Sequence, residues 1–312
     1  MHVLVAGAGA LGSVFGGLLR RAGCAVTLLG RSAHLDAIGR DGLRISGIWG
    51  EHHVRGFELC TTPPRIVTET ILLTVKSYDT RAAIESVAPC LAPDGVVISL
   101  QNGLGNVESI EAVVSPARTL GARVIFGVEV TQPGCVRVTV YADRVLVGAR
   151  RSGVHPALDE RARQWTARFD AAGIPSAYSD DIEAALWAKV FYNAALNPLG
   201  ALLGVGYGAL AEHADTRAIM DAVIDEAFAV ARAEAIRLQW SSAAEYRALF
   251  YDRLVPSTFD HRSSMLQDLE RGRRTEIEAI NGAIWRRGNA HSIVTPVNET
   301  LTRLVRYREQ RR

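Results

Sequence analysis

The chain has 312 residues, of which 48% are hydrophobic and 22% are charged, and its formal net charge at pH 7 is +2. This composition excludes a disordered or fibrous chain and is typical of a soluble globular protein, and so small a net charge argues against binding of nucleic acid. The length suits two domains, because single domains usually hold about 100 to 200 residues.

Four cysteines, Cys24, Cys60, Cys90 and Cys135, are far apart in the chain and form no C-x-x-C pair. This spacing favours reduced thiols in a cytoplasmic protein, and neither the cysteines nor the histidines show the spacing of a zinc site. The amino terminus lacks the basic segment and the cleavage site of a signal peptide. We therefore expect a cytoplasmic protein with no metal site.

The start of the chain predicts one unit of strand, turn, helix and strand. His2–Ala6 and Ala25–Leu29 are apolar runs typical of strands, and Ser13–Ala22 has a helical pattern that ends at Gly23. The turn between them, Gly7-Ala8-Gly9-Ala10-Leu11-Gly12, matches the pattern G-x-G-x-x-G. Found between a strand and a helix, this pattern predicts a dinucleotide site.

Each glycine of this turn has a separate task in such a site. The first makes the tight turn, the second lets the backbone approach a pyrophosphate, and the third lets the helix pack against the strand. Amides at the start of the helix then bind the phosphates. The expected cofactor-binding residues are therefore Gly7, Ala8, Gly9, Ala10, Leu11 and Gly12.

The end of the second strand bears on the choice between NAD and NADP. About 20 residues after the glycine turn, NAD sites usually carry an acid that binds the ribose 2′-hydroxyl. This chain has Gly30-Arg31-Ser32 there instead. A guanidinium suits a 2′-phosphate, so we expect NADP with Arg31 among its ligands. Because arginine is abundant in this chain, Arg31 could stand there without a binding role, but this abundance does not account for the missing acid.

Further apolar runs indicate a parallel sheet covered on both faces. Thr70–Val75, Val96–Leu100 and Thr119–Ile125 are apolar throughout rather than alternating, and the segments Asp79–Ala88 and Asn106–Val114 have helical patterns. Two polar residues follow these runs, Lys76 after the first and Asn102 after the second. Carboxyl ends of strands are where ligands bind in open α/β sheets, although Asn102-Gly103 also fits a plain turn.

The rest of the chain predicts a hairpin and then an all-helical second half. Val128–Gly148 alternates and contains Pro133 and Gly134, which predicts an antiparallel hairpin closing the first domain. We expect an α/β Rossmann-type dinucleotide-binding domain at residues 1–178 and an all-α C-terminal domain at residues 179–312. The expected helices are Asp180–Asn197, Asp215–Leu238, Ser242–Leu254, Ser263–Arg287 and Thr295–Arg308.

One uncharged segment in this half is long enough to span a bilayer. It is Val190–Ala211, but Pro198 and four glycines make it a poor match to a lipid-facing helix. We expect a buried helix that breaks after Asn197, and no membrane partner.

Only two of the 35 lysines and arginines are lysine, namely Lys76 and Lys189. A lysine amine can give up its proton where an arginine cannot, so catalysis is one reason to keep lysine in an arginine-rich chain. Lys189, Asn193 and Asn197 are four residues apart and so line one helix face within about 80°. Buried among apolar residues, they need polar partners, either a ligand or an internal network that only fixes helix packing.

A second polar set lies in the expected helix Ser263–Arg287. Ser264 and Glu276 would be about 120° apart around one continuous helix. Either Gly272 bends this helix or the two side chains approach a cleft from different sides.

Several motifs, taken together, resemble the ketopantoate (2-dehydropantoate) 2-reductase family over essentially the whole chain. They are Gly7–Gly12, Val75-Lys76 with Asp79-Thr80, Gln101-Asn102-Gly103-Leu104-Gly105, Trp187-Ala188-Lys189 with Asn193 and Asn197-Pro198-Leu199, Ser263–Asp268, and Arg274-Thr275-Glu276-Ile277 with Ile280-Asn281-Gly282. The resemblance implies NADPH-dependent reduction of a 2-oxo acid to a 2-hydroxy acid in pantothenate and coenzyme A biosynthesis.

The resemblance also implies roles for individual residues. Lys189 resembles the proton donor to the ketone oxygen, and Glu276 resembles the acid bound to the cofactor and the catalytic centre. The substrate-binding positions correspond to Asn193, Asn197 and Ser264, and the positions beside the nicotinamide ribose to Lys76 and Asn102. 

One departure concerns the substrate. Some members have a substrate-binding asparagine ten residues after the Asn197 position, where this chain has Tyr207. A reductase of another 2-oxo acid and a non-catalytic nucleotide sensor therefore stay open as alternatives, and so does a homodimer.

Overall fold

The computed structural model describes residues 1–311, which fall into two compact units. The first unit consists of Met1–Asn102 and Asn106–Ile182. The second, called here the helical unit, consists of Gly103–Gly105 and the chain from Glu183 onward. Each unit is described by itself.

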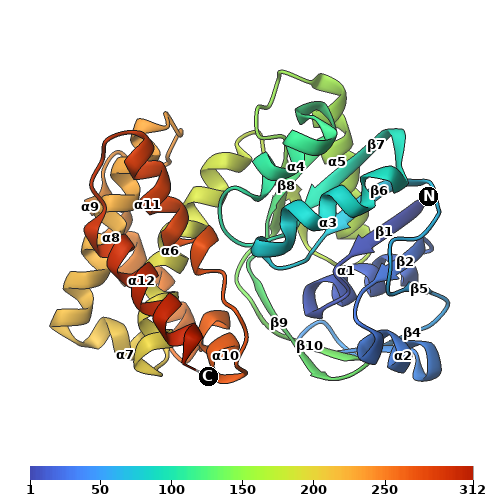
Figure 1. Ribbon diagram of the computed structural model, residues 1–312, viewed down its shortest axis with the longest axis horizontal. Helices are drawn as coiled ribbons and strands as arrows, with labels where there is room; N and C mark the ends of the chain where they lie inside the picture. Colours follow the sequence, from blue (N-terminus) through green and yellow to red (C-terminus); the bar gives the residue numbers. More distant parts are fainter. Residues whose placement is uncertain (312) are drawn as a thin grey trace. The chain divides into compact units, whose positions relative to one another are not determined.

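Strands and helices alternate in the first unit (Figure 1). The elements are β1 His2–Ala6, α1 Ala10–Arg21, β2 Ala25–Leu29, α2 Ser32–Asp41, β3 Leu43–Gly47, β4 His52–Val54, β5 Glu58–Cys60, β6 Thr68–Leu73, α3 Thr80–Val87, β7 Leu91–Ser99, α4 Asn106–Val114, β8 Thr119–Arg123, β9 Phe126–Gln132, β10 Cys135–Tyr141, β11 Val145–Gly148, α5 Pro156–Ala171 and β12 Ser176–Tyr178. 

The main sheet confirms the expected Rossmann-like topology. Its strands lie in the order β12-β11-β8-β7-β6-β1-β2-β5, and every neighbouring pair from β8 to β5 is parallel. Strands β1 and β2 have the predicted bounds. The chain crosses from β1 to β2 on one side and later pairs β6 on the other side of β1, so β1 lies at the switch point where ligands bind in such sheets.

Both faces of this sheet are buried, which explains the unbroken apolar strands. Val3 and Val5 of β1 belong to the core beneath α1 and α5. Leu4 and Ala6 point to the opposite core, which α3 and α4 cover (Figure 1). A strand with both faces covered has no polar side, so its sequence does not alternate.

The predicted hairpin is only partly right. β9 and β10 do pair as an antiparallel hairpin, with Gly134 at φ +79° in the turn, but they belong to a second sheet of order β4-β3-β10-β9. β11 instead pairs antiparallel with β8 in the main sheet. The alternating pattern continues across this division because Val136 and Val138 of one sheet and Val145 and Val147 of the other all face the same core.

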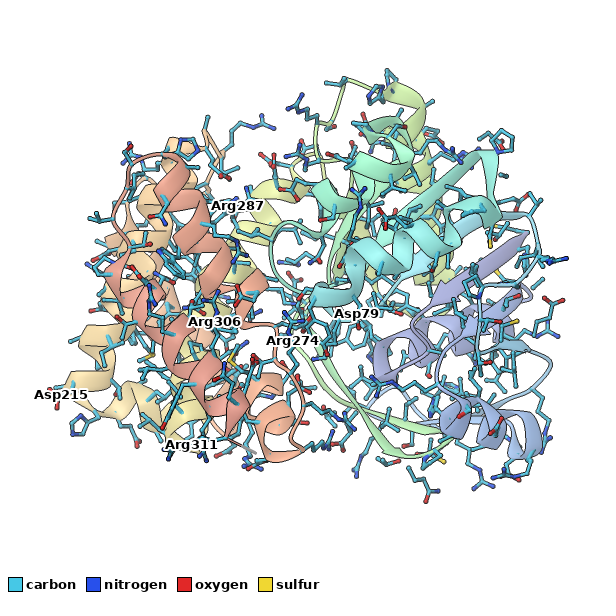
Figure 2. All side chains as sticks on the ribbon, viewed as in Figure 1. Asp79, Asp215, Arg274, Arg287, Arg306 and Arg311 are labelled. Carbon is cyan, nitrogen blue, oxygen red and sulfur yellow. The ribbon has the colours of Figure 1, made fainter. Side chains whose placement is uncertain are left out.

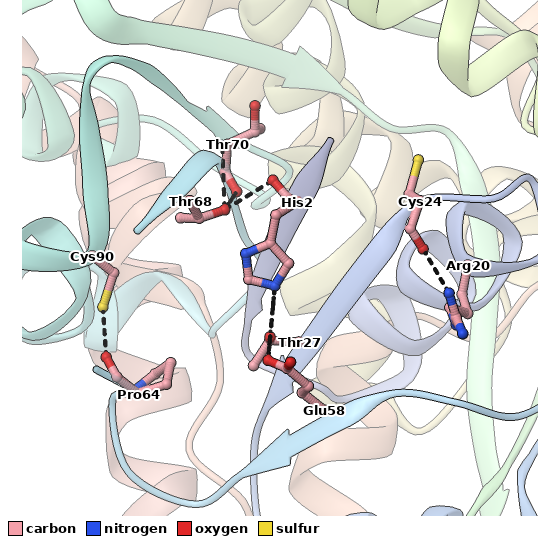
Figure 3. A network of polar contacts seen from close by, with 9 residues as sticks. All are labelled: His2, Arg20, Cys24, Thr27, Glu58, Pro64, Thr68, Thr70 and Cys90. Carbon is pink, nitrogen blue, oxygen red and sulfur yellow. Dashed lines mark hydrogen bonds and ion pairs between the residues drawn. The ribbon is translucent and has the colours of Figure 1, made fainter. Parts of the chain in front are cut away.

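A polar network fixes the opposite end of the parallel strands (Figure 3). The hydroxyl of Thr27 on β2 contacts His2 Nε2 at 2.9 Å and donates to Glu58 Oε2 at 2.8 Å. The hydroxyl of Thr68 donates to the His2 carbonyl at 2.9 Å. These contacts hold β6, β1, β2 and β5 in register at their amino-terminal ends, away from the edge that carries the glycine turn.

The helical unit follows. Its elements are α6 Ile182–Leu203, α7 Tyr207–Glu212, α8 Ala214–Ala233, α9 Ala243–Leu249 continued by a π turn Phe250–Leu254, a 3₁₀ turn Pro256–Thr258, α10 Ser264–Glu270, a 3₁₀ turn Ile277–Ala279, α11 Asn281–Ala290 and α12 Pro296–Gln310. No helix within residues 1–311 is long and apolar enough to cross a membrane.

The single helix expected at Ser263–Arg287 is wrong. The structure has α10 and α11, and the segment between them contains only the 3₁₀ turn Ile277–Ala279. Gly272 adopts φ +60°, a left-handed conformation that ends a helix, and the Arg273 amide bonds back to the Asp268 carbonyl. The alternative in which Gly272 bends one continuous helix is therefore wrong, because Gly272 ends α10.

The helix break expected after Asn197 is also wrong, because α6 continues through Pro198 to Leu203. A proline has no N–H to donate to the carbonyl four residues earlier, here that of Ala194. The Asn281 side chain donates to this carbonyl instead, at 3.0 Å. Both Ala194 and Asn281 are fully buried, so this replacement satisfies an acceptor that water does not reach.

Candidate functional site

The glycine turn between β1 and α1 accepts no side chain at its first and last glycines. Gly7 has φ +111°, and a Cβ there would lie 2.6 Å from the Val75 nitrogen. A Cβ on Gly12 would lie 2.4 Å from the Gly7 carbonyl oxygen. The Thr74 hydroxyl donates to the same Gly7 oxygen at 2.7 Å. The turn is therefore packed directly on the end of β6.

The middle of the turn is open by contrast. Gly9 is exposed, and a Cβ there would come no closer than 4.0 Å to its neighbours. Helix α1 begins at Ala10, and its first bond back to Gly9 comes from Ser13, so the amides of Ala10, Leu11 and Gly12 precede the helical ladder. An exposed backbone followed by three amides without helical acceptors is suited to binding a pyrophosphate.

The structure places Arg31 beside this turn. Gly30 follows β2, and a Cβ on it would lie 2.9 Å from the Ala8 Cβ, so the end of β2 packs against the glycine turn. Arg31 comes next, exposed, and precedes the first residue of α2.

Lys76 and Asn102 follow the neighbouring strands β6 and β7 at the same edge of the sheet. A buried network joins the two loops. The Gln101 amide donates to the Val75 carbonyl at 2.9 Å and to the Thr80 hydroxyl at 2.7 Å. The Asn102 carbonyl, for its part, accepts from the Asn106 side chain at 2.8 Å. Gln101 has no predicted role of its own, yet it fixes the loops that carry Lys76 and Asn102.

In the helical unit, α6 carries Lys189, Asn193 and Asn197 on successive turns of one face. Asn193 and Asn197 are only 8% and 4% exposed. The expected burial of Lys189 is only partly right, because its side chain is half-buried. A half-buried ammonium keeps part of its hydration and avoids most of the cost of burying a charge.

The two amides on this face are incompletely paired. Within residues 1–311 the Asn193 side chain makes no hydrogen bond, and Asn197 uses only its Oδ1, which accepts from the Tyr207 hydroxyl at 2.6 Å. Amide groups more than nine-tenths buried rarely remain without partners. The internal network that would merely fix helix packing is therefore incomplete, and the amide atoms without a partner are not fully buried, so they are open to water or to a ligand.

Ser263 and Ser264 have different surroundings at the start of α10. Ser264 is the first residue of the helix and is exposed. Ser263 is fully buried, and its hydroxyl accepts from the Leu266 amide at 3.0 Å as a helix cap. The same hydroxyl lies 3.5 Å from the Asn197 carbonyl. Ser263 thus fixes α10 against α6 and leaves the Ser264 hydroxyl exposed beside that contact.

Glu276 is 7% exposed and lies between α10 and α11, in a segment that α12 holds on both sides. The preceding Thr275 amide donates to Glu309 at 2.7 Å. Glu278 forms an ion pair with Arg306, which Figure 2 labels. This pairing lowers the pKa of the Glu278 carboxyl and keeps it charged. Two anchors around Glu276 leave its backbone little freedom.

Burial also decides the protonation of groups near both polar clusters. It raises the pKa of the Tyr207 phenol well above its ordinary value, so this hydroxyl stays a donor. In the first unit, burial lowers the pKa of His34. His34 Nδ1 accepts from the Gly134 amide at 3.1 Å and its Nε2 lies 2.9 Å from the Ser13 hydroxyl, so a neutral imidazole joins α2 to α1 and to the hairpin turn.

The fold, the open glycine turn and the lysine beside two buried amides define a dinucleotide-dependent oxidoreductase. Residues 3–152 match the family profile described as "Ketopantoate reductase PanE/ApbA", and residues 181–309 match its C-terminal counterpart. The chain is 38% identical over 311 residues to the 2-dehydropantoate 2-reductase of Aquifex aeolicus, an alignment that covers 99% of this chain and 97% of that one. The chain therefore belongs to the ketopantoate reductase family, and the resemblance inferred from its motifs is confirmed.

Two solved structures are similar over the full length. A PanE/ApbA family ketopantoate reductase from Ralstonia eutropha is 35% identical with a TM-score of 0.88, covering 100% of this chain and 99% of that one. D-mandelate dehydrogenase, solved with NADH and anilino(oxo)acetate, is 27% identical with a TM-score of 0.90 and the same coverage. The family consists of NAD(P)-dependent reductases that act on small molecules.

Proposed function

We propose that this chain reduces 2-dehydropantoate to pantoate with NADPH, a step in the formation of pantothenate and coenzyme A. The observation that carries the proposal is the full-length similarity to the Aquifex enzyme. The half-buried lysine and the two incompletely paired amides on one face of α6 support it, since a keto acid needs a proton donor and polar anchors.

The cofactor would bind to the first domain, proposed as residues 1–178. The open backbone at Gly9 and the amides of Ala10 and Leu11 would hold the pyrophosphate, while Gly7 and Gly12 let the turn pack closely. Arg31 would pair with the 2′-phosphate of NADPH, and Lys76 and Asn102 would contact the nicotinamide ribose. The bound cofactor supplies a hydride to the carbonyl carbon of the substrate.

The second domain, proposed as residues 179–312, would supply the rest of the chemistry. As the carbonyl oxygen gains negative charge, the Lys189 ammonium stabilises it and then donates a proton to it, which completes the 2-hydroxy acid. Glu276 would hold the Lys189 ammonium in its charged form against the effect of burial. 

Substrate contacts would come from Asn193, Asn197, Ser264 and Asn102. Amide and hydroxyl groups can bind both the carboxylate and the hydroxyl of the substrate. The incomplete pairing of Asn193 and Asn197 is the structural reason for placing them there.

A second candidate is the reduction of a different 2-oxo acid, or the oxidation of the matching 2-hydroxy acid, with the same residues. The full-length similarity to D-mandelate dehydrogenase, solved with NADH and an oxoacetate, favours it. Because of that similarity, NADH should be tested as a cofactor beside NADPH.

The test is oxidation of NADPH, followed at 340 nm, by purified protein with 2-dehydropantoate and a panel of aliphatic and aromatic 2-oxo acids. We expect the highest kcat/KM with 2-dehydropantoate and NADPH. A far higher kcat/KM with another acid would support the second candidate, and no turnover with any acid would favour a nucleotide-sensing protein. The expected cytoplasmic location and homodimer stay predictions, which cell fractionation and light scattering would check.

A further inference from the structure

The residue at position 207 contacts one of the proposed substrate-binding residues. The Tyr207 hydroxyl donates to Asn197 Oδ1 at 2.6 Å. Tyr207 is 3% exposed and Asn197 is 4% exposed, so neither group can exchange this bond for one with bulk water. 

The position of the Tyr207 ring is set by its surroundings. Its amide donates to the His261 carbonyl at 3.2 Å, and the next amide, of Gly208, donates to Phe259 at 2.9 Å. A Cβ on Gly208 would lie 2.2 Å from the Phe259 ring, so this close approach needs glycine. The ring also packs edge-on against Tyr192, with centroids 5.7 Å apart. 

The bond decides which end of the Asn197 amide is available. An asparagine side chain offers one carbonyl acceptor and one amino donor, at opposite ends of a planar group. Tyr207 occupies the carbonyl end, and the Asn197 amino group makes no hydrogen bond within residues 1–311. Rotating the amide would turn its amino group toward the Tyr207 oxygen and leave the buried Tyr207 proton without the one acceptor it has within residues 1–311.

We propose that Tyr207 is a positioning residue that locks Asn197 as a hydrogen-bond donor, so that the site selects substrates with an acceptor oxygen opposite Asn197. The inference rests on the proposed function, because it needs Asn197 to face the substrate. A carboxylate, ketone or hydroxyl oxygen meets the requirement, and a group that can only donate does not. A fixed amide also costs less ordering on binding than a rotating one.

The experiment is a double-mutant cycle on kcat/KM with Tyr207→Phe, Asn197→Ala and the double variant. Tyr207→Phe keeps the packed ring and removes only the donor. We expect KM for the substrate to rise roughly 10-fold, the factor for one neutral hydrogen bond, with kcat changed less than about twofold. In the Asn197→Ala background the same change should have no further effect on KM, because Tyr207 acts through Asn197.

The matched control is Tyr192→Phe. Tyr192 belongs to the same aromatic cluster, but its hydroxyl bonds to Thr258 at 2.5 Å and not to Asn197. This variant should keep the KM of the unmodified protein. Equal KM changes in the two tyrosine variants, or additive effects of Tyr207→Phe and Asn197→Ala, would overturn the positioning role while the measured turnover still supports the proposed function. A protein that reduces no 2-oxo acid would overturn both.

Discussion

The most direct test of the helical unit concerns the carbonyl that Pro198 leaves without its usual donor. Asn281 Nδ2 donates to the Ala194 carbonyl and to Asn298 Oδ1, each at 3.0 Å, and Asn281 is fully buried. Asn281→Ala leaves both acceptors without this donor. At about 1 to 3 kcal/mol for each buried unsatisfied acceptor, the free energy of unfolding should fall by about 2 to 4 kcal/mol. This is the lower part of the range for two acceptors, because the substitution also removes Asn281 Oδ1, which is itself buried and unpaired within residues 1–311.

A second substitution separates the two acceptors. Pro198→Ala restores a backbone N–H that can bond to the Ala194 carbonyl in the ordinary helical manner. In that background Asn281→Ala leaves only Asn298 Oδ1 without its donor, and the loss in free energy of unfolding should be smaller by about 1 to 2 kcal/mol. The four proteins form a double-mutant cycle, so the effect of Pro198→Ala on the unfolded chain cancels.

Urea unfolding followed by circular dichroism at 222 nm measures the four free energies. A coupling energy of about 1 kcal/mol or more supports the substitution of a side-chain donor for the missing backbone donor. If Asn281→Ala costs the same in both backgrounds, to within about 0.5 kcal/mol, Asn281 does not replace the bond that Pro198 lacks and the explanation of the long helix fails.

Three further predictions concern chemistry, cofactor and pH. Lys189→Ala should lower kcat by about 100-fold or more, and Lys189→Arg should not restore it, since arginine keeps its proton; steady-state kinetics with near-normal kcat would exclude Lys189 as the donor. Arg31→Asp should shift the ratio of kcat/KM for NADPH over NADH toward NADH, and an unchanged ratio would remove Arg31 from the cofactor site. Because burial lowers the pKa of His34, the unfolded chain takes up its proton first as the pH falls below about 6.5. The free energy of unfolding should therefore decrease from pH 7.5 to 5.5, and it should decrease by less in His34→Gln. Urea unfolding of both proteins at the two pH values measures this, and an equal decrease in the two proteins would contradict the prediction.

The parallel core of the first unit could be predicted because its strands obey one local rule. β1 and β2 are covered on both faces and their interior residues are buried, so their sequences do not alternate between apolar and polar residues. Helix α1 begins at Ala10, earlier than the expected Ser13, because the last residues of the glycine turn are already helical. The short strand β12, by contrast, has only three residues and no distinctive pattern, and its place follows from pairing with β11.

The spacing of the candidate site residues could be predicted, but their pairing could not. Helical periodicity is enough to align Lys189 with Asn193 and Asn197. Nothing in that periodicity shows that Tyr207, on another helix, bonds to Asn197 or that Ser263 caps α10 beside it. Those contacts depend on how separate helices pack, which a single sequence does not encode locally.

Pro198 in α6 shows a case in which rules based on local sequence fail to predict where a helix ends. The rule that ends a helix at proline rests on one missing donor and on a clash with the preceding turn, and it assumes that nothing else supplies the donor. In α6 the donor comes from Asn281, 83 positions further along the chain than Pro198, and it is itself held by Asn298. Since Asn298 also donates to Glu226 at 2.7 Å, the length of α6 depends on a chain of buried polar contacts through α11, α12 and α8. The helix that carries the proposed catalytic lysine is therefore set by tertiary hydrogen bonds as much as by its own sequence.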